Sequence, residues 1–407
     1  MRGEILFLAH RLPFPPDRGD KIRSHHILKA LAKIAPVHVG CLAESDDDAE
    51  NAHHLDDVAA SWCMPRRSKP LPLAGVEALM RGTPVSLSAF RSASLMDWVR
   101  QTVGTRNICA IYVFSGQMGQ YVPHDWQGRL VMDLVDVDSA KFEAYGKAGI
   151  GPRSWIDARE GRLLKRVEAD LVSRADATLL VSEAEAQFLQ SRLSSRHLIR
   201  ALGNGIDCTF FDPEGFGSRS QFGSGGPHYV FTGQMDYAPN VEAVTRMARQ
   251  IMPEVRRSLP HAQFHIVGRA PTREVIQLEG LHGTSVIGAV PDTRPWLAGA
   301  DAIVAPLTIA RGVQNKVLEA MAMARPVVLS PDAATGIDAR SNTHFLIAET
   351  DAAFAANLLR LAKEPLTAAS LGEQARRFVL EHMSWSAMLA DLPRLLGMDQ
   401  EAPRDAA

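Results

Sequence analysis

Short apolar runs alternate with helix-patterned stretches in the first half of the chain. The apolar runs lie at residues 4–9, 37–42, 111–114, 130–134 and 177–181. Their length and continuous apolar character are typical of strands buried in a parallel sheet. Apolar residues at helical spacing predict helices between several of these runs, at residues 20–33, 155–174 and 183–192. The alternation predicts a doubly wound parallel sheet, with residues 45–57 and 65–72 on surface loops or short helices.

The same alternation begins again in the second half. Strands are expected at residues 229–232, 263–267, 285–287, 302–305 and 327–329. Helices are expected at residues 241–252, 272–278, 294–298, 313–324, 352–363 and 368–382. Between the two halves, residues 203–207 have the composition of a turn, and residues 215–227 are rich in Gly and Ser, as flexible linkers are.

Two α/β domains of similar size, facing each other across a cleft, are therefore expected. Residues 1–202 would form the first and residues 203–384 the second. The amphipathic residues 385–397 predict a helix that packs back on the first domain, and residues 398–407 predict a flexible tail. Ligands of such sheets bind at the carboxyl ends of the strands, so the chemistry should come from the loops that follow them.

Composition narrows the class of protein. The 407 residues are 46% hydrophobic and 22% charged, with a net charge of −2, which is typical of a globular protein and does not favour nucleic-acid binding. The four cysteines are far apart in the sequence and form no metal-binding pattern, so reduced thiols in a cytoplasmic protein are expected. No apolar run is long enough for a signal peptide core or a membrane span.

The N-terminal residues 1–35 are locally basic, with seven Lys and Arg against three acidic residues. A solvated helix face is the favoured explanation, because charge runs commonly have no partner. The alternative is peripheral contact of this patch with anionic lipid headgroups of the inner membrane, or with a phosphorylated acceptor.

The most informative stretch is residues 311–328, which reads as a glycine-containing loop, a helix and an apolar strand. Its apolar positions fall on one side of a helical wheel, as a core-facing stripe does; they are Val313, Val317, Ala320, Met321 and Ala324. Gly312, Gln314, Asn315, Lys316 and Glu319 gather at the polar start. Helix-start amides and the Lys316 cation suit a diphosphate, and Glu319 can accept hydrogen bonds from ribose hydroxyls. The alternative is an ordinary surface helix with solvated charges.

Two loops of the first domain offer further polar groups. After the first strand, Gly19 would let a phosphate or sugar approach the backbone, and Asp20 could bond a sugar hydroxyl, act as a base or simply cap the helix. After a later strand, Asp133, Asp136 and Asp138 could orient a hydroxyl or accept its proton. One alternative for this acidic group is capping of the next helix. Another is metal binding, because Asp136-x-Asp138 resembles the D-x-D sequence with which one large class of sugar transferases binds a metal ion.

Glycines follow two strands of the second domain as well. Gly233 and Gly268 each precede a predicted helix, where backbone amides bind phosphate readily, although tight turns use glycine just as often. Arg269 or Arg311 could neutralise a diphosphate through the planar guanidinium.

Together these motifs resemble a known family. They are R-x-P-x-P-P-D-x-G-D at residues 11–20, N-G-I-D at 204–207, F-x-G-x-M-x-Y-x-P-N at 231–240, V-G-x-x-P at 267–271, A-P-L at 305–307 and R-G-x-Q-N-K-V-L-E-A-M-A-M-x-R-P-V-V at 311–328. The chain is similar to retaining family-four glycosyltransferases of the GT-B fold, and among them to sugar transferases of bacterial exopolysaccharide and PEP-CTERM/exosortase systems. The resemblance spans about residues 4–385.

The resemblance implies transfer of a sugar from a nucleotide-diphosphate donor to an acceptor hydroxyl. It places the donor in the second domain and the acceptor, a glycan or lipid-linked sugar, on the first. It implies a cytoplasmic enzyme that needs no metal or other cofactor. Glu319 matches the second glutamate of the family's paired-glutamate motif, which holds the ribose, whereas Arg311 stands where the first glutamate is usual. Val135-Asp136 stands where the family has His before Asp, so no histidine role carries over.

The sequence thus predicts a hexosyl- or other glycosyltransferase with sites in both domains. The catalytic candidates are Asp136, Asp133 and Asp20. The donor-binding candidates are Gly19, Gly233, Gly268, Arg269, Arg311, Gly312, Gln314, Asn315, Lys316 and Glu319. The alternatives are a non-catalytic sugar-nucleotide-binding assembly protein, a sugar-nucleotide epimerase or hydrolase on the same fold, and a metal-dependent D-x-D transferase.

Overall fold

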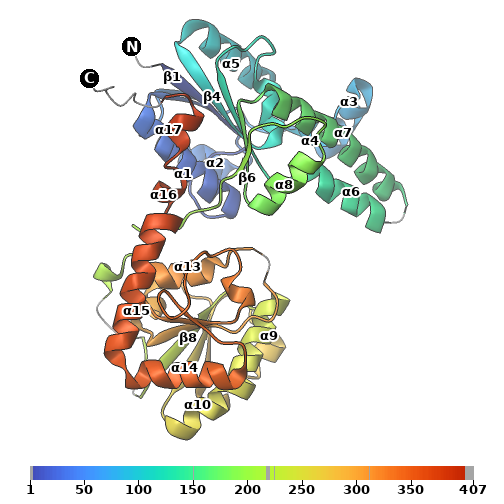
Figure 1. Ribbon diagram of the computed structural model, residues 1–407. Coiled ribbons are helices and arrows are strands. Elements are labelled where there is room, and N and C mark those ends of the chain that lie inside the picture. The colour runs from blue at the N-terminus through green and yellow to red at the C-terminus, as the bar shows by residue number, and fades with distance from the viewer. Residues whose placement is uncertain (1–2, 150, 217–220, 224, 311, 399–407) are drawn as a thin grey trace, which may run out of the picture. The chain divides into compact units, whose positions relative to one another are not determined.

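The computed structural model describes residues 3–149, 151–216, 221–223, 225–310 and 312–398. The chain forms two compact units (Figure 1). Unit 1 contains the described residues up to Asn204 and from Met388 onward, and unit 2 contains Gly205–Ala387. The division at Asn204 means that the Gly- and Ser-rich residues 215–227 belong to unit 2 and do not join the units. Residues 217–220 and 224 of that stretch lie outside the described residues.

Within the described residues, unit 1 is built on a seven-stranded sheet in the order β3-β2-β1-β4-β5-β6-β7, with every neighbouring pair parallel. The strands are β1 (Glu4–Ala9), β2 (Val37–Gly40), β3 (Ser61–Cys63), β4 (Ile108–Phe114), β5 (Arg129–Val135), β6 (Ala177–Leu180) and β7 (Ile199–Ala201). The order reverses between β1 and β4, which is where ligands bind in such sheets. The short edge strands β3 and β7 were not predicted, because they are half-buried and lack a continuous apolar run.

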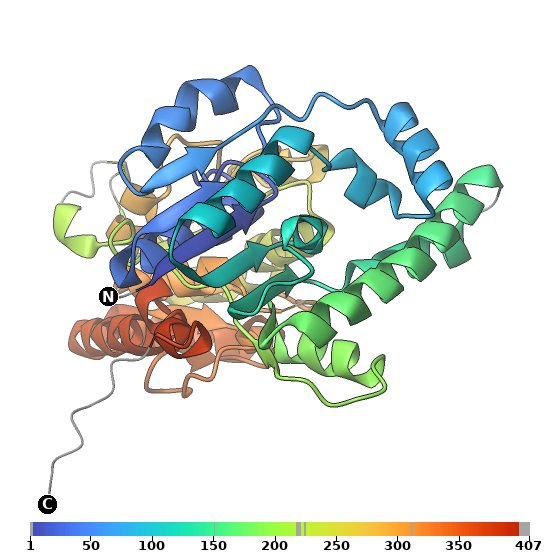
Figure 2. The same ribbon diagram turned by 90° about the horizontal axis from the view of Figure 1, so that it is seen from above.

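The helices of unit 1 pack around this sheet and beyond it (Figure 2). They are α1 (Gly19–Ile34), α2 (Asp46–Glu50), α3 (Leu71–Arg81), α4 (Val85–Ala89), α5 (Ala93–Thr105), α6 (Asp138–Ala148), α7 (Pro152–Arg174), α8 (Glu183–Ser191) and α17 (Leu392–Leu395). Helices α6 and α7 form a hairpin in which Gly146 and Gly161 permit close approach, since a Cβ at either would lie 2.9 Å from the facing backbone. Helix α3 starts with a proline at its first turn, where a missing amide costs little, although the two prolines had suggested a loop.

The basic residues of the N-terminal segment are largely engaged inside unit 1. Arg23 pairs with Asp133 at 3.0 Å, and Lys21 pairs with Asp48 at 2.9 Å, all four side chains being buried. Arg11 and Arg18 reach Glu44 at 2.6 and 3.3 Å. Of the described Lys and Arg residues in this segment, Lys29 and Lys33 remain exposed with no ion pair recorded. Most of the described cations of this segment are therefore paired within unit 1, and the expected contact with anionic lipid stays a prediction.

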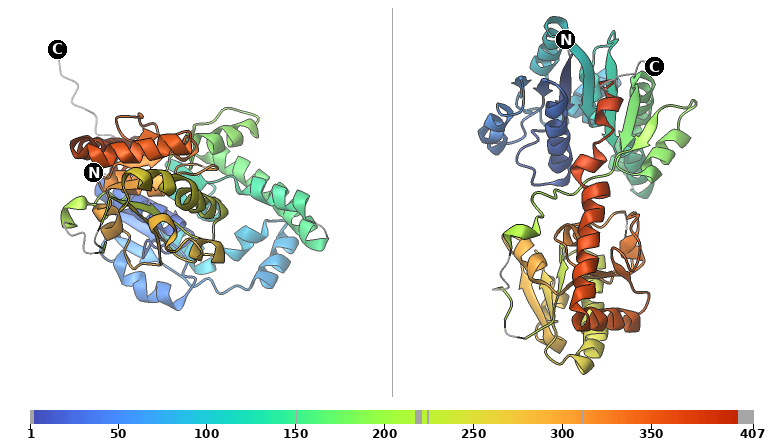
Figure 3. Two further views of the ribbon diagram at one scale, coloured as in Figure 1. Left: turned by 90° about the horizontal axis from the view of Figure 1, so that it is seen from below. Right: turned by 60° about the vertical axis from the view of Figure 1, so that its left-hand side comes forward.

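In its described residues, unit 2 repeats the architecture with a parallel sheet in the order β10-β9-β8-β11-β12-β13. The strands are β8 (His228–Thr232), β9 (Gln263–Val267), β10 (Thr284–Gly288), β11 (Ala302–Ala305), β12 (Val327–Leu329) and β13 (Leu346–Ile347). The helices are α9 (Ala238–Arg246), α10 (Met252–Ser258), α11 (Arg273–Ile276), α12 (Arg294–Gly299), α13 (Asn315–Ala322), α14 (Asp351–Lys363) and α15 (Pro365–Phe378). Figure 3 shows helices on both sides of this sheet, so the prediction of two doubly wound parallel α/β domains is confirmed.

The helix predicted over residues 313–324 is shorter in the structure. Helix α13 begins at Asn315, and Val313 precedes it with 39% of its surface exposed. Val317, Ala320 and Met321 are fully buried, as the apolar stripe predicted. The prediction that Val313 belongs to this stripe was wrong, because the loop before α13 continues for two residues beyond the predicted start of the helix.

The C-terminal segment is not the single helix predicted over residues 385–397. Two short helices, α16 (Trp385–Met388) and α17, replace it, with Pro393 in the first turn of α17. Helix α17 packs against α1, and the Arg129 side chain donates a 2.9 Å hydrogen bond to the carbonyl of Leu395. The chain thus returns to unit 1 at its end. Apart from Met398, the predicted tail lies outside the described residues.

Candidate functional site

A pocket of about 670 Å³ opens at the carboxyl edge of the unit 2 sheet. Its walls are the loops after β8, β9 and β10, the start of α9 and the first turn of α13. The lining residues are Thr232, Gly233, Gln234, Tyr237, Asn240, Val267, Gly268, Arg269, Ala289, Val290, Thr293, Val313, Gln314, Asn315, Lys316 and Glu319. The strand order reverses between β8 and β11, so the pocket lies at the switch point of this sheet.

Two glycines form the floor of this pocket because no larger residue fits there. A Cβ at Gly268 would lie 1.6 Å from the carbonyl oxygen of Gly233. A Cβ at Gly233 would lie 2.8 Å from the Asn240 amide nitrogen and 3.1 Å from Lys316 Nζ. The two loops therefore pack backbone against backbone, with Lys316 directly above them.

Lys316 is a half-buried cation of the pocket. Its Nζ donates a 2.6 Å hydrogen bond to Asn240 Oδ1 and lies 4.0 Å from the centre of the Phe231 ring. Asn240 is itself oriented by a 2.9 Å bond from its amide nitrogen to the carbonyl of Gln234. Burial lowers the pKa of Lys316 to about 7, with Glu319 opposing the shift. An anion in the pocket would favour the charged ammonium.

Glu319 follows Lys316 by one helical turn. Burial raises the pKa of its carboxyl to about 7, although Lys316 acts in the opposite direction. Within the described part of the chain, no side chain or amide is recorded as donating a hydrogen bond to this carboxylate. A half-buried carboxylate without donors is costly, so Glu319 is poised to accept hydroxyl groups from a ligand.

The start of α13 adds backbone donors. Gln314 caps the helix with an extended backbone and no side-chain bond, and the first-turn amides of Asn315 and Lys316 have no acceptor within the helix. Gly312 has a φ of +68°, the left-handed region that favours glycine. At the opposite wall, exposed Arg269 donates a 3.1 Å bond to Gln234 Oε1. Arg311 lies outside the described residues, so its predicted role stays a prediction.

The pocket thus combines a half-buried ammonium, free amides at a helix start and an unsatisfied carboxylate. Such a set can hold an anionic group at Lys316 and α13 while Glu319 binds neighbouring hydroxyls. The structure brings together the predicted Gly233, Gly268, Arg269, Gln314, Asn315, Lys316 and Glu319 in one pocket. Gly19 belongs to unit 1, where a Cβ would meet nothing within 4 Å, and it does not line this pocket.

In unit 1, Asp20 lies in the first turn of α1 and does not cap the helix, whose N-cap is Arg18. Its carboxylate accepts a 3.3 Å hydrogen bond from His10 and pairs with Arg11. The hydrogen bond to His10 and the charge of Arg11 hold the pKa of Asp20 far below its usual range. A carboxylate so well stabilised is a weak base and is better suited to orienting His10.

Asp133 is fully buried and its carboxylate is saturated. It accepts hydrogen bonds from Arg23 at 3.0 and 3.1 Å and from the Tyr112 hydroxyl at 2.9 Å. Burial raises the pKa of Tyr112 well above its ordinary value, and the charge of Asp133 adds to this shift while the charge of Arg23 opposes it. These contacts assign Asp133 to the packing of unit 1 rather than to contact with an acceptor.

Asp136 and Asp138 lie at the carboxyl end of β5 and remain half-exposed. Both pair with Lys141, at 2.8 and 3.3 Å. The preceding Val135 has a φ of +69°, a strained conformation for a β-branched residue of the kind that is concentrated at functional sites. Among the described residues, no three or more His, Cys, Asp or Glu side chains are grouped as a metal site requires.

Sequence reasoning missed Asn240 and His10. Asn240 was included only as the last residue of the motif at residues 231–240, with no role of its own, yet it positions Lys316. His10 lies at the carboxyl end of β1, stacks on Phe114 at 5.6 Å and has a buried Nδ1 without a hydrogen-bond partner. The sequence could have indicated His10, because it directly follows a predicted buried strand and so lies at the edge of the sheet where ligands bind.

Comparison with known proteins agrees with this geometry. Residues 226–364, within unit 2, match a family model described as glycosyl transferases group 1. That segment contains every residue that lines the pocket. No curated protein sequence is significantly similar to the chain.

Solved structures of several glycosyltransferases share the whole fold. A structure of Anabaena HepE with UDP and glucose is 14% identical, with a TM-score of 0.59 over 97% of this chain and 100% of that one. Sucrose-phosphate synthase from Thermosynechococcus elongatus is 17% identical, with a TM-score of 0.59 over 97% and 98%. WaaG, a glycosyltransferase involved in lipopolysaccharide biosynthesis, is 14% identical, with a TM-score of 0.56 over 97% and 100%. The predicted resemblance to GT-B glycosyltransferases is confirmed at the level of fold.

Proposed function

We propose that this protein is a glycosyltransferase that moves a sugar from a nucleotide-diphosphate sugar to an acceptor hydroxyl. One observation carries the proposal: the unit 2 pocket joins Lys316, held by Asn240, to the free amides of α13 and the donor-free Glu319. Lys316 and the amides of α13 match the negative charge of a diphosphate. Glu319 matches the hydroxyls of a ribose.

In this proposal the diphosphate lies against Lys316 and the first-turn amides of α13. As the bond between sugar and phosphate breaks, negative charge grows on the leaving diphosphate, and the cation and the helix dipole stabilise it. Arg269 can add a second positive charge from the opposite wall. Glu319 accepts hydrogen bonds from the ribose, which fixes the nucleotide and therefore the position of the sugar.

Asp136 and Asp138 of unit 1 are proposed to orient the acceptor, a glycan or a lipid-linked sugar. They follow the strained Val135 at the carboxyl end of β5 and are exposed enough to bond hydroxyls. Lys141 pairs with both carboxylates and offsets one of their two negative charges, which supports a reaction that uses no metal at this D-x-D sequence. His10, oriented by Asp20 at the neighbouring switch point, is a second group that could contact the acceptor.

The biological setting proposed is bacterial exopolysaccharide or cell-surface glycan assembly by a retaining, cytoplasmic enzyme at the periphery of the inner membrane. The motif resemblance supports it, together with the structural likeness to WaaG of lipopolysaccharide biosynthesis and to HepE bound to UDP and glucose.

The test begins with the donor. A panel of UDP-, GDP- and ADP-sugars is screened for thermal stabilisation of the protein, because a bound ligand raises the melting temperature. The best donor is then titrated by calorimetry into wild type, Lys316→Ala and Glu319→Ala. Each variant should bind about 10- to 100-fold more weakly, since each loses a hydrogen bond to a charged group. Exposed Lys363→Ala on α14 is the matched control and should bind as wild type does.

Turnover is tested by product analysis with and without an acceptor, in the presence and absence of a chelator. Acceptor-dependent release of nucleoside diphosphate that survives chelation supports the proposal. Conversion of the donor alone would indicate an epimerase or hydrolase, and binding without turnover for any acceptor would indicate an assembly protein. Unchanged affinity in both pocket variants would refute the site.

A further inference from the structure

Helix α3 of unit 1 exposes an unusual number of large apolar side chains. Their exposed fractions are 68% for Leu71, 61% for Leu73, 55% for Val76, 59% for Leu79 and 80% for Met80. The small residues Ala74 and Ala78 of the same helix are fully buried. An apolar helix face left in water needs a partner, since contiguous exposed patches of this kind usually mark an interaction surface.

Helix α3 is held against α7, which extends the surface. Arg159 of α7 donates a 3.1 Å hydrogen bond to the carbonyl of Ala78, and buried Glu160 accepts bonds of 2.7 and 2.8 Å from the amides of Val85 and Ser86. Trp155 and Ile156 lie one turn earlier on the same side of α7, with 61% and 50% of their surfaces exposed. We call the exposed side chains of residues 71–81 and 153–166 the α3–α7 surface.

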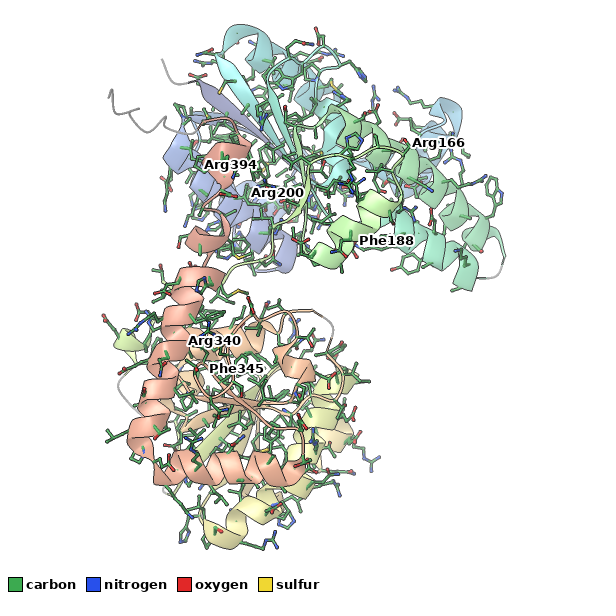
Figure 4. The ribbon with its side chains drawn as sticks, viewed as in Figure 1. Arg166, Phe188, Arg200, Arg340, Phe345 and Arg394 are labelled. Carbon is green, nitrogen blue, oxygen red and sulfur yellow. The ribbon has the colours of Figure 1, made fainter. Side chains whose placement is uncertain are left out.

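This surface and its surroundings are strongly basic. Residues 145–166 contain six Lys and Arg against two acidic residues, in a chain whose net charge is −2. The four Lys and Arg of residues 64–81 are paired with Asp46, Glu44 and Glu77, so the excess charge lies on the α7 side of the surface. On α7, Arg162 and Arg166 continue the line of Trp155 and Arg159 at helical spacing, and both are exposed. Figure 4 labels Arg166 on α7.

We propose that the α3–α7 surface docks on an anionic lipid bilayer. The apolar side chains of α3 and Trp155 enter the boundary between headgroups and acyl chains, while Arg162 and Arg166 contact lipid phosphates. The charge favours a bilayer over a second copy of this chain, because two copies would bring like charges together. Within the described residues, no helix is long and apolar enough to cross a membrane.

The inference rests on the proposed function only in that a lipid-linked acceptor would give docking a purpose. Vesicle binding is measured without donor or acceptor. A protein that does not bind vesicles can therefore still bind the donor, and a protein that does not bind the donor can still bind vesicles.

The experiment is flotation of the full chain with phosphatidylcholine vesicles, with and without phosphatidylglycerol. Binding should require phosphatidylglycerol and weaken with salt. Leu73→Glu with Met80→Glu should reduce binding more than about tenfold, because the charged side chains cannot enter the acyl boundary. Arg162→Glu with Arg166→Glu should reduce it at least about 30-fold.

Matched double variants test whether position matters. Leu366→Glu with Leu380→Glu changes two exposed apolar residues of unit 2, and Lys29→Glu with Lys33→Glu reverses two exposed charges on α1. Both should float as wild type does, and circular dichroism checks that every variant is folded. Absence of flotation by wild type, or an equal loss in test and control variants, would overturn the proposal. So would a wild-type dimer in light scattering that Leu73→Glu with Met80→Glu converts to monomer, since a second copy would then be the partner.

Discussion

Lys316 and Glu319 lie one turn apart on α13, and burial moves the pKa of both to about 7. Burial disfavours both an ammonium and a carboxylate, so near pH 7 each group is close to the midpoint between its charged and neutral forms. A diphosphate would restore the charge on Lys316, and ribose hydroxyls would favour the ionised Glu319. Binding of the donor and protonation of the pocket are therefore coupled.

The first prediction is a pH optimum of donor binding near pH 7. Affinity should fall as the pH rises above about 7, because Lys316 loses the proton that attracts the diphosphate. It should also fall below about 7, because Glu319 gains a proton and accepts hydroxyls less well. Calorimetry across pH in two buffers of different ionisation enthalpy measures both the affinity and the proton uptake. Lys316→Ala should abolish the alkaline fall, and an alkaline fall that persists in this variant would assign it to another group.

The second prediction concerns Asn240, which positions Lys316 through a 2.6 Å hydrogen bond. Asn240→Ala should weaken donor binding by about tenfold, because Lys316 loses its orientation. Asn240→Asp should weaken it further, since the new carboxylate pairs with Lys316 and repels the diphosphate. Equal donor affinities of the two variants, measured by calorimetry, would show that charge at position 240 does not matter.

At the scale of elements, the donor pocket depends on how closely the loops after β8 and β9 approach each other. The backbones of Gly233 and Gly268 touch, and hydrogen bonds join the loops further: Gly233 N to Val267 O at 3.1 Å and Met235 N to Arg269 O at 2.9 Å. This close packing leaves room for Lys316 of α13 above the glycines. The strand ends thus set the depth of the pocket, and the helix supplies its charges.

The third prediction tests this packing. Gly268→Ala would place a Cβ 1.6 Å from the Gly233 oxygen, so the loops must separate. We expect a loss of about 1–3 kcal/mol in the free energy of unfolding of unit 2 and weaker donor binding. Chemical denaturation and calorimetry measure the two effects. Gly215→Ala, where a Cβ meets nothing within 4 Å, is the control and should change neither.

At the scale of the whole molecule, two units with separate hydrophobic cores carry different parts of the proposed reaction. Unit 1 is tied together by the buried pair of Arg23 and Asp133, and Arg23 also donates to the carbonyl of Leu202 at 2.7 Å. Unit 2 contains the complete donor pocket. Stability and donor binding should therefore respond separately to substitutions in the two units.

The fourth prediction follows from this separation. Arg23→Met leaves the Asp133 charge buried without its partner, which should destabilise unit 1 by about 3–5 kcal/mol. Hydrogen exchange read by mass spectrometry should show faster exchange in the unit 1 sheet, whereas the donor affinity of unit 2 stays within about twofold of wild type. A matching loss of protection in β8 and β9 would show that the two units unfold together.

The sequence determined the parallel strands and the chemistry of the pocket. Strands at Ala302–Ala305 and Val327–Leu329 were predicted to the residue, because a strand buried on both faces must be apolar throughout. The strand at Gln263–Val267 was also predicted to the residue, although it contains Gln263 and His265. Lys316 and Glu319 could be identified because their spacing is set within one helix. Helix α3 escaped prediction because Pro70 and Pro72 stand at its start and because most of its large apolar side chains are exposed, so no core-facing stripe marks it.

The tertiary structure alone decided what each polar group does. Asp133, Asp136 and Asp138 look alike in sequence, yet Arg23 and Tyr112 enclose the first, and Lys141 holds the other two near solvent. Most described cations of the N-terminal segment form pairs inside unit 1, although Lys29 and Lys33 stay exposed, whereas Arg162 and Arg166 of α7 are both exposed. These outcomes depend on distant partners: Arg23 and Asp133 are 110 residues apart in the chain, and Arg23 and Leu202 are 179 apart. Local patterns of hydrophobicity specify elements, but the charge, burial and accessibility of a side chain depend on which distant elements pack against it.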